Sequence, residues 1–472
     1  MADAATATER RFRMPHTLVI VAGLIVIVLL LSWVVPSGTY QRADRDGRQV
    51  TVPGTYQQVE KVHLGPQWLM IAPIRGFLDG ALIIAFLLMI GGVFGVVQAT
   101  GTIEFAIRRI TAALTTRPAL ERLMIPVLMI VFSLGGSVFG MAEEVIPFIL
   151  IFVPLALSLG YDSIVGTSIP FLGAASGFAA AFFNPFTVGV AQGLVGLPLY
   201  SGLGYRVLTW VVGTGVIITW VMIYAARVKR RPESSPVYEL DRARDLSALR
   251  PTHEVEPWTG RRIAVIAIFL LSMVALVWGI LDQQWFIEEI AALFLAMGLV
   301  MGAVAGLRPS AIATSFVAGA KDMVTVCLII ACGRALLILA REGLVLDTIL
   351  YASSQAIGGL PGVMAAQVMF LVQSVINFFI HSGTAQAALT MPIMAPLADL
   401  IGLTRQTTVY AFQLCEFINP ILPTSAVTMG VLGMAKIPWE TWARWFLPLM
   451  LILVALSLVL LVPPVLVHWG PF

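Results

Sequence analysis

One arrangement of residues occurs twice in this chain, at a spacing of 242 positions. Three residues of the first half recur in the second half at that spacing: Gly101 with Gly343, Pro154 with Pro396, and Gly160 with Gly402. Each half also has an Asn-Pro pair inside an apolar segment, at Asn184-Pro185 and at Asn419-Pro420. Duplicated membrane units with interrupted helices are the arrangement from which secondary transporters build a midplane site. The duplication therefore predicts two structural repeats.

Composition excludes a water-soluble domain. Hydrophobic residues make up 58% of the chain and charged residues 12%, whereas soluble chains are about 25% charged. Several apolar stretches reach the roughly 20 residues that are needed to cross a hydrocarbon core. The clearest are His16–Pro36, Ala81–Ala99, Val207–Ala226, Ile263–Leu281 and Phe446–Val467. The three cysteines have no paired spacing, so neither a disulfide framework nor a metal site is predicted.

The positions of Lys and Arg predict the orientation, because these residues accumulate on the cytoplasmic side. Arg10, Arg11 and Arg13 precede the first helix, and the polar stretch 227–262 holds nine Lys/Arg against six acids. We therefore expect a multi-pass protein of the cell membrane (the bacterial inner membrane) with a cytoplasmic N-terminus. The loop after the first helix is then outside. Its segments Arg48–Val52 and Tyr56–Glu60, joined by Pro53-Gly54-Thr55, predict a small extracytoplasmic β-hairpin.

Two long apolar segments are interrupted by polar, glycine-containing tips. Glu121–Gly160 has its tip at Gly135–Glu144, and Gly362–Gly402 has its tip at Asn377–Gln386. Irregular backbone at membrane depth is tolerated only inside protein or against a water-filled cavity. We interpret both segments as re-entrant helical hairpins, which leave the chain on the side where it entered.

With both hairpins re-entrant, the two repeats have opposite orientations. The predicted fold is therefore an all-α polytopic membrane protein with two inverted-topology repeats, each with a re-entrant hairpin and a broken helix. The predicted organisation is a tail, first transmembrane helix and outer loop (1–68), repeat 1 (69–226), a basic cytoplasmic linker (227–262), two connecting transmembrane helices (263–310) and repeat 2 (311–472).

The two helix breaks are candidate binding sites. Proline lacks an N–H and disrupts the pairing of the carbonyl one turn earlier, so each break exposes backbone carbonyls and a half-helix N-terminus. Carbonyls suit Na⁺, and the positive helix end suits a carboxylate. The candidate ligands at the breaks are Asn184, Thr187, Asn419, Thr424 and Ser425. A purely structural kink is the alternative for either break taken alone.

The hairpin tips supply the remaining candidates. Ionisable groups at membrane depth are costly and usually functional, which favours Glu143 or Glu144 as a cation-binding or proton-accepting carboxylate. The alternative is that these acids cap the following helix. His381 is either a protonatable gate or a polar tip residue. The other candidates at the tips carry neutral polar side chains: Ser137, Ser382, Thr384 and Gln386.

Arg334 lies in the middle of an apolar helix, too far from either end to reach water easily. The guanidinium is expected either to pair with an acid, such as Glu416 or Asp322, or to bind an anionic substrate.

Three strings in the chain resemble one known family. They are Gly140–Phe148, Asn184–Gln192 and Gln386–Leu400. The resemblance is to the YfcC-like branch of the four-carbon dicarboxylate anaerobic carrier family, within the ion transporter superfamily, and it extends from the first helix to the last. It implies inverted repeats, two re-entrant hairpins, two interrupted helices, frequent dimers and an elevator motion. Its members are labelled as carriers of basic amino acids, dicarboxylates or small peptides.

The chain departs from this family at two places where ligands are expected. The second tip usually resembles Pro-Ser-Gly-Ser-Gly-Gln, and here it is His381–Gln386. The second break usually has a stretch rich in Gly and Asp before the Asn, and here Leu414–Ile418 replaces it. Because both departures lie at expected ligand positions, the substrates that are named for other family members do not carry over directly to this chain.

The sequence thus predicts a secondary active transporter of a small amino-acid-like or carboxylate solute. We expect no cofactor, a coupling Na⁺ or H⁺ or else exchange, a homodimer in the lipid bilayer, and no nucleic-acid partner. A channel-like or signalling membrane protein is the alternative, but a pore needs no duplicated broken helices. An intramembrane enzyme is disfavoured, because adjacent His381 and Ser382 cannot readily form a base–nucleophile pair.

Overall fold

The computed structural model describes residues 17–45, 48–244, 258–283, 285 and 287–470. The arginines before the first helix and part of the linker lie outside this range. Within it, nine helices are long and apolar enough to cross a membrane. The expectation of an all-α polytopic membrane protein is therefore confirmed.

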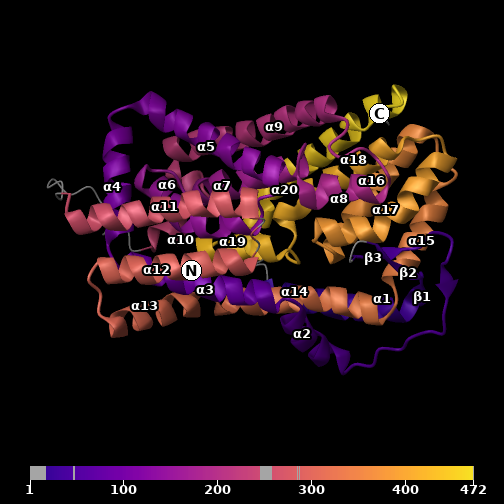
Figure 1. The fold of residues 1–472 in the computed structure, drawn as a ribbon, viewed down its shortest axis with the longest axis horizontal. Helices are drawn as coiled ribbons and strands as arrows, with labels where there is room; N and C mark the ends of the chain where they lie inside the picture. The colour runs from indigo at the N-terminus through magenta and orange to yellow at the C-terminus, as the bar shows by residue number, and fades with distance from the viewer. Residues whose placement is uncertain (1–16, 46–47, 245–257, 284, 286, 471–472) are drawn as a thin grey trace, which may run out of the picture.

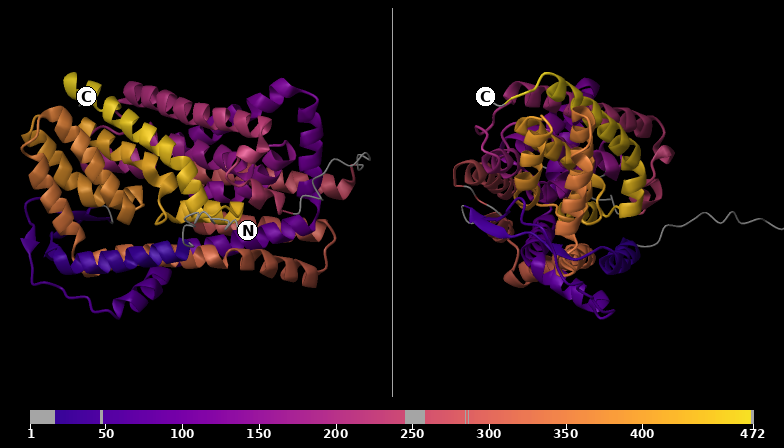
Figure 2. Two further views of the ribbon diagram at one scale, coloured as in Figure 1. Left: turned by 180° about the vertical axis from the view of Figure 1, so that it is seen from behind. Right: turned by 90° about the vertical axis from the view of Figure 1, so that its right-hand side faces the viewer.

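A layer of helices lies along the lower side of Figure 1, and we call this layer the slab. The helix α14 packs against α1 and α2, and α3 packs against α12 and α13. Views from behind and from the side show the same layer beneath the rest of the chain (Figure 2). The slab comprises α1 (Thr17–Val34), α2 (Trp68–Asp79), α3 (Ala81–Ala99), α12 (Ile287–Val304), α13 (Pro309–Asp322) and α14 (Val324–Glu342).

Above the slab, the first half of the chain contains the expected hairpin and broken helix. Between the hairpin arms lies a short non-α segment, and the crossing that follows is interrupted at Asn184-Pro185. The elements are α4 (Thr102–Thr115), α5 (Pro118–Phe139), η1 (Glu143–Phe148), α6 (Ile149–Ser158), α7 (Ser163–Ala179), η2 (Pro185–Gly189), α8 (Val190–Leu194) and α9 (Leu203–Arg230).

The second half repeats this order of elements. Its hairpin arms meet at His381–Ser382, and its second crossing is interrupted around Asn419-Pro420. The elements are α15 (Leu346–Ile357), α16 (Gly362–Phe379), α17 (Gly383–Leu400), α18 (Arg405–Leu414), η5 (Cys415–Ile421), α19 (Ala426–Ala435), α20 (Trp439–Leu460) and α21 (Val462–Leu466). We call the elements α5 to α9 and α16 to α20 the block.

Three expectations stay predictions: that the two repeats are inverted, that the hairpins are re-entrant, and that the organisation has the residue limits given above. The arms α5 and α16 are themselves long enough to cross a membrane.

Between the halves lie η3 (Pro232–Ser234), α10 (Tyr238–Arg242) and α11 (Gly260–Gln283). The side chain of Asp241 accepts a hydrogen bond from Ser163 N at 2.8 Å, so the linker caps the start of α7.

The loop after α1 contains a hairpin, but the predicted strand pairing is wrong. The strand β3 (Arg48–Thr51) pairs with β2 (Arg42–Arg45), and β4 (Gln57–Gln58) pairs with β1 (Gly38–Thr39). In the sequence, β2 and β3 are separated by Asp46-Gly47, which lies outside the described residues. Asp-Gly between extended segments is a strong hairpin signal, and it outweighs the three-residue Pro-Gly-Thr connection.

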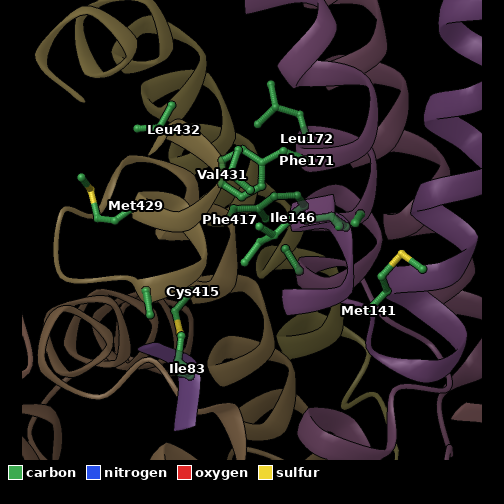
Figure 3. Packing of buried hydrophobic residues seen from close by; sticks show 14 of the residues in the cluster. Ile83, Met141, Ile146, Phe171, Leu172, Cys415, Phe417, Met429, Val431 and Leu432 are labelled. Carbon is green, nitrogen blue, oxygen red and sulfur yellow. The ribbon is translucent and has the colours of Figure 1, made fainter. Parts of the chain in front are cut away.

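The core joins the two halves directly behind the first hairpin tip. Ile146 of η1, Phe171 of α7, Phe417 of η5 and Val431 of α19 lie together in Figure 3. Nearby, the Trp442 indole is fully buried and donates to the Pro420 carbonyl at 2.7 Å. A carbonyl released by the second break therefore has a partner, and the break is fixed in place by packing.

Candidate functional site

A cavity of about 180 Å³ lies where the two hairpin tips, the second break and α14 meet. Its walls combine residues from the block with Ile83 and Arg334 from the slab. Eight of the predicted site residues line it: Glu143, Glu144, His381, Ser382, Thr384, Asn419, Thr424 and Ser425. The fold thus brings together tips and a break that are far apart in the sequence.

The first tip presents two carboxylates to this cavity. The helix α5 ends at Phe139 and is followed by Gly140, whose φ of 77° is in the left-handed region that glycine tolerates best. The chain then turns into η1, which begins with Glu143 and Glu144. Glu144 accepts a hydrogen bond from the Ala142 amide at 2.8 Å, so it does stabilise the start of η1. Both acids nevertheless line the cavity.

The second tip is fixed to both breaks. The His381 imidazole forms a hydrogen bond with the Thr424 hydroxyl at 2.7 Å, and the Thr384 hydroxyl donates to the Phe186 carbonyl at 2.9 Å. Ser382 caps α17 by accepting from the Ala385 amide at 3.4 Å. These contacts hold the tip between the first and second halves.

The second tip is also a wall between two cavities. Ser382 and Thr384 line a further cavity of about 660 Å³, whose other side is formed by the loop after α1 and by α14 and α15. Within it, Arg42 pairs with Asp347 at 2.7 Å.

The second break contributes a carboxylate that the sequence analysis did not place in the site. Glu416 is buried, with 1% of its surface exposed, and lines the cavity. One of its oxygens accepts a hydrogen bond from the Asn419 amide, whereas Oε1 has no hydrogen-bond partner. An acid next to an Asn-Pro pair in an apolar segment was the available signal.

Four predicted site residues lie outside the cavity lining. Asn184 accepts hydrogen bonds from the amides of Phe186 and Thr187 at 2.8 and 3.3 Å, so its carbonyl oxygen caps the first break. Ser137 accepts from the Phe182 amide at 3.2 Å.

Gln386 donates to the Gln373 side chain at 2.8 Å, and Thr187 is fully buried. The amide nitrogen of Asn184 and the hydroxyl of Thr187 have no hydrogen-bond partner. The roles of these residues in binding stay predictions.

Arg334 lines the cavity as well, and it pairs with an acid as expected, although with neither Glu416 nor Asp322. Its guanidinium donates to Asp79, the last residue of α2, at 3.4 Å, whereas Asp322 pairs with Lys436 at 3.0 Å. The preceding Gly333 lets α14 approach the second break, since a Cβ there would lie 3.3 Å from Thr424 Cα. A sequence cannot show which acid a helix crossing brings to an arginine.

The cavity therefore offers two kinds of electrostatic partner. Three carboxylates (Glu143, Glu144 and Glu416) line it, and the first turns of α17 and α19 contribute Gly383 and Ala426 to its wall. Helix N-termini carry positive partial charge. One small solute can thus place a cationic group against the acids and an anionic group against a helix end. The described residues hold no cluster of three or more His, Cys, Asp or Glu arranged to bind a metal ion.

Comparison with known proteins identifies the family. The family model described as DcuC, C4-dicarboxylate anaerobic carrier, matches residues 14–465. The chain belongs to this family. It is also 38% identical to the "Putative basic amino acid antiporter YfcC" of Escherichia coli K12, over 92% of this chain and 93% of that protein. The resemblance to the YfcC-like branch is therefore confirmed.

Other similar proteins are more distant. An uncharacterized protein of Haemophilus influenzae is 27% identical over 97% of this chain and 98% of its own length. Among solved structures, the YdaH transporter of Alcanivorax borkumensis covers 97% of this chain and 100% of its own, with a TM-score of 0.42 and 16% identity. Neisseria gonorrhoeae MtrF, described as an antimetabolite efflux pump, covers 95% of both chains, with a TM-score of 0.40 and 17% identity.

Membership of this carrier family makes the protein a membrane transporter of small molecules and not an enzyme. The channel-like or signalling alternative is accordingly not favoured.

Proposed function

We propose that this C4-dicarboxylate anaerobic carrier family member is a secondary active transporter that exchanges small solutes bearing both an amino and a carboxylate group, with cationic amino acids as the preferred class. The observation that carries this proposal is the cavity itself, in which three carboxylates and two helix N-termini converge. The printed name of the Escherichia coli relative, a putative basic amino acid antiporter, supports the same class.

Charge balance favours a cationic solute over a dicarboxylate, because three carboxylates and one guanidinium, that of Arg334, line the cavity. Glu143, Glu144 and Glu416 would repel a second carboxylate, and low local dielectric strengthens that repulsion. An ammonium or guanidinium group near these acids gains charge-assisted hydrogen bonds, which are roughly twice as strong as neutral ones. Glu416 lines the cavity, so its carboxylate is an acceptor that we expect such a group to use.

For the transport step we propose an elevator motion of the block against the slab. Residues of both the block and the slab line the cavity. If the block slides along the slab, it would carry across the membrane a solute that is held by the tips and the second break. The second tip, which separates two cavities, would act as a gate. Coupling to Na⁺ or H⁺ and a homodimeric assembly complete the proposal.

A counterflow measurement tests the proposed substrate class. Purified protein in proteoliposomes loaded with unlabelled L-arginine should accumulate labelled L-arginine, whereas liposomes loaded with succinate should not accumulate labelled succinate. Repeating the uptake with Na⁺ or pH gradients would identify the coupling ion. Succinate counterflow without L-arginine counterflow would contradict the cationic class and favour a dicarboxylate carrier.

A further inference from the structure

Arg334 is a cation of the slab that reaches into the acidic cavity of the block. It is carried by α14, which packs against α1 and α2, yet it lines the cavity together with Glu143 and Glu416. Among the described residues that line this cavity, it is the one arginine or lysine.

The ion pair with Asp79 does not account fully for this arginine. The Arg334–Asp79 distance is 3.4 Å, close to the limit for a hydrogen bond. Asp79 is shared with Arg341, seven residues further along α14, at 3.8 Å. Two guanidinium groups thus face a single carboxylate, whereas the neighbouring cavity holds three carboxylates.

An acidic cavity without a cation is costly, because buried charges need compensation. We propose that Arg334 is the resident counter-cation of the empty site: its guanidinium balances the carboxylates until a cationic solute displaces it. The displacement part of this proposal rests on the proposed cationic substrate.

A consequence for transport follows from the location of Arg334 on the slab. If the block moves without solute, its carboxylates leave Arg334 and lose their compensation. If the block moves with a cationic solute, the solute provides the charge. This difference disfavours movement of the block without a bound solute. Outward movement of one solute is therefore coupled to inward movement of another, and exchange is the preferred mode of transport.

A first test requires no knowledge of the substrate. In Arg334→Ala, methylguanidinium at low millimolar concentration should occupy the vacated place and raise the thermal midpoint of the purified protein, because a ligand that binds the folded state stabilises it. The midpoints of the wild type and of Arg341→Ala should rise less, because Arg334 there competes with methylguanidinium for the carboxylates. Arg341 is the matched control, since it faces the same Asp79 but does not line this cavity. An equal response of Arg334→Ala and Arg341→Ala, or none in either, would overturn the inference.

A second test measures equilibrium binding of labelled L-arginine. Suppose that the Arg334 guanidinium pairs with the cavity carboxylates about nine-tenths of the time. Its removal should then tighten the apparent affinity for L-arginine about tenfold. Arg334→Gln should show this gain, and Arg334→Lys, which keeps the charge, should resemble the wild type. Weaker binding by Arg334→Gln would make Arg334 a ligand of the solute and would overturn the inference while leaving the proposed function intact. Absence of L-arginine binding to the wild type would instead contradict the proposed function, and the methylguanidinium test would still decide the role of Arg334.

Discussion

Glu416→Gln is expected to reduce the kcat/KM of L-arginine uptake about 30-fold or more, equivalent to a loss on the order of 2 kcal/mol. The substitution keeps the shape of the side chain and leaves an oxygen to accept from Asn419. It removes the ability to ionise from a side chain that is 1% exposed and lines the cavity. The loss should therefore appear in transport and not in the amount of folded protein, which size-exclusion chromatography would measure.

Glu342→Gln is the matched control for this experiment. Glu342 lies at the end of α14, has a side chain that is 43% exposed and pairs with Arg75 at 2.5 Å, away from the cavity lining. An exposed pair of this kind contributes little to stability, so uptake should be close to wild type. Equal uptake by Glu416→Gln and Glu342→Gln would show that the charge at position 416 is not used.

Gly177→Ala is expected to have the largest effect on stability. The helices α5 and α7 cross so closely that a Cβ at position 177 would lie 1.7 Å from the Ser133 carbonyl oxygen. The helices would have to separate, which would also disturb the hydrogen bond between the Ser133 and Ser176 hydroxyls, now 2.9 Å long. Overpacking of this kind costs about 1–3 kcal/mol and sometimes more. The thermal midpoint and the yield of inserted protein should both fall.

Gly215→Ala on α9 separates this steric effect from the general effect of replacing a helical glycine. A Cβ at position 215 would meet nothing within 4 Å, and alanine favours the helix by up to about 1 kcal/mol. The thermal midpoint of Gly215→Ala should be unchanged or slightly higher. If Gly177→Ala behaves in the same way, the close crossing of α5 and α7 is wrong.

Most of the helices could be predicted from the sequence, because hydrophobic length and proline are local signals. The helix Ala81–Ala99 has the predicted limits, and the breaks lie at Asn184-Pro185 and around Asn419-Pro420. The strand pairing in the loop after α1 was also predictable, because Asp46-Gly47 is a stronger hairpin signal than Pro53-Gly54-Thr55, but our prediction rested on the weaker turn.

The composition of the site was only partly predictable, because sequence locates a break but not the direction in which its side chains point. The carbonyl oxygen of Asn184 is used by the backbone of its own break, whereas Asn419 reaches the cavity. Glu416 enters the site because η5 packs against the first half, and Arg334 enters because Gly333 lets α14 approach the second break. Both depend on helix packing across the repeats, which no local motif encodes.

Access to the cavity from both sides of the membrane tests the central claim most directly. Ala175, a half-buried residue of α7, lines the cavity, and cysteine there is a small change. In a variant without Cys327, Cys332 and Cys415, we expect Ala175→Cys to react with a membrane-impermeant maleimide from either side and to be protected by L-arginine. Ala311→Cys, at an exposed position of α13, is the control and should react from one side, without protection. Reaction of Ala175→Cys from one side under all conditions, with no protection by any transported solute, would contradict an alternating-access site between the hairpin tips and the second break.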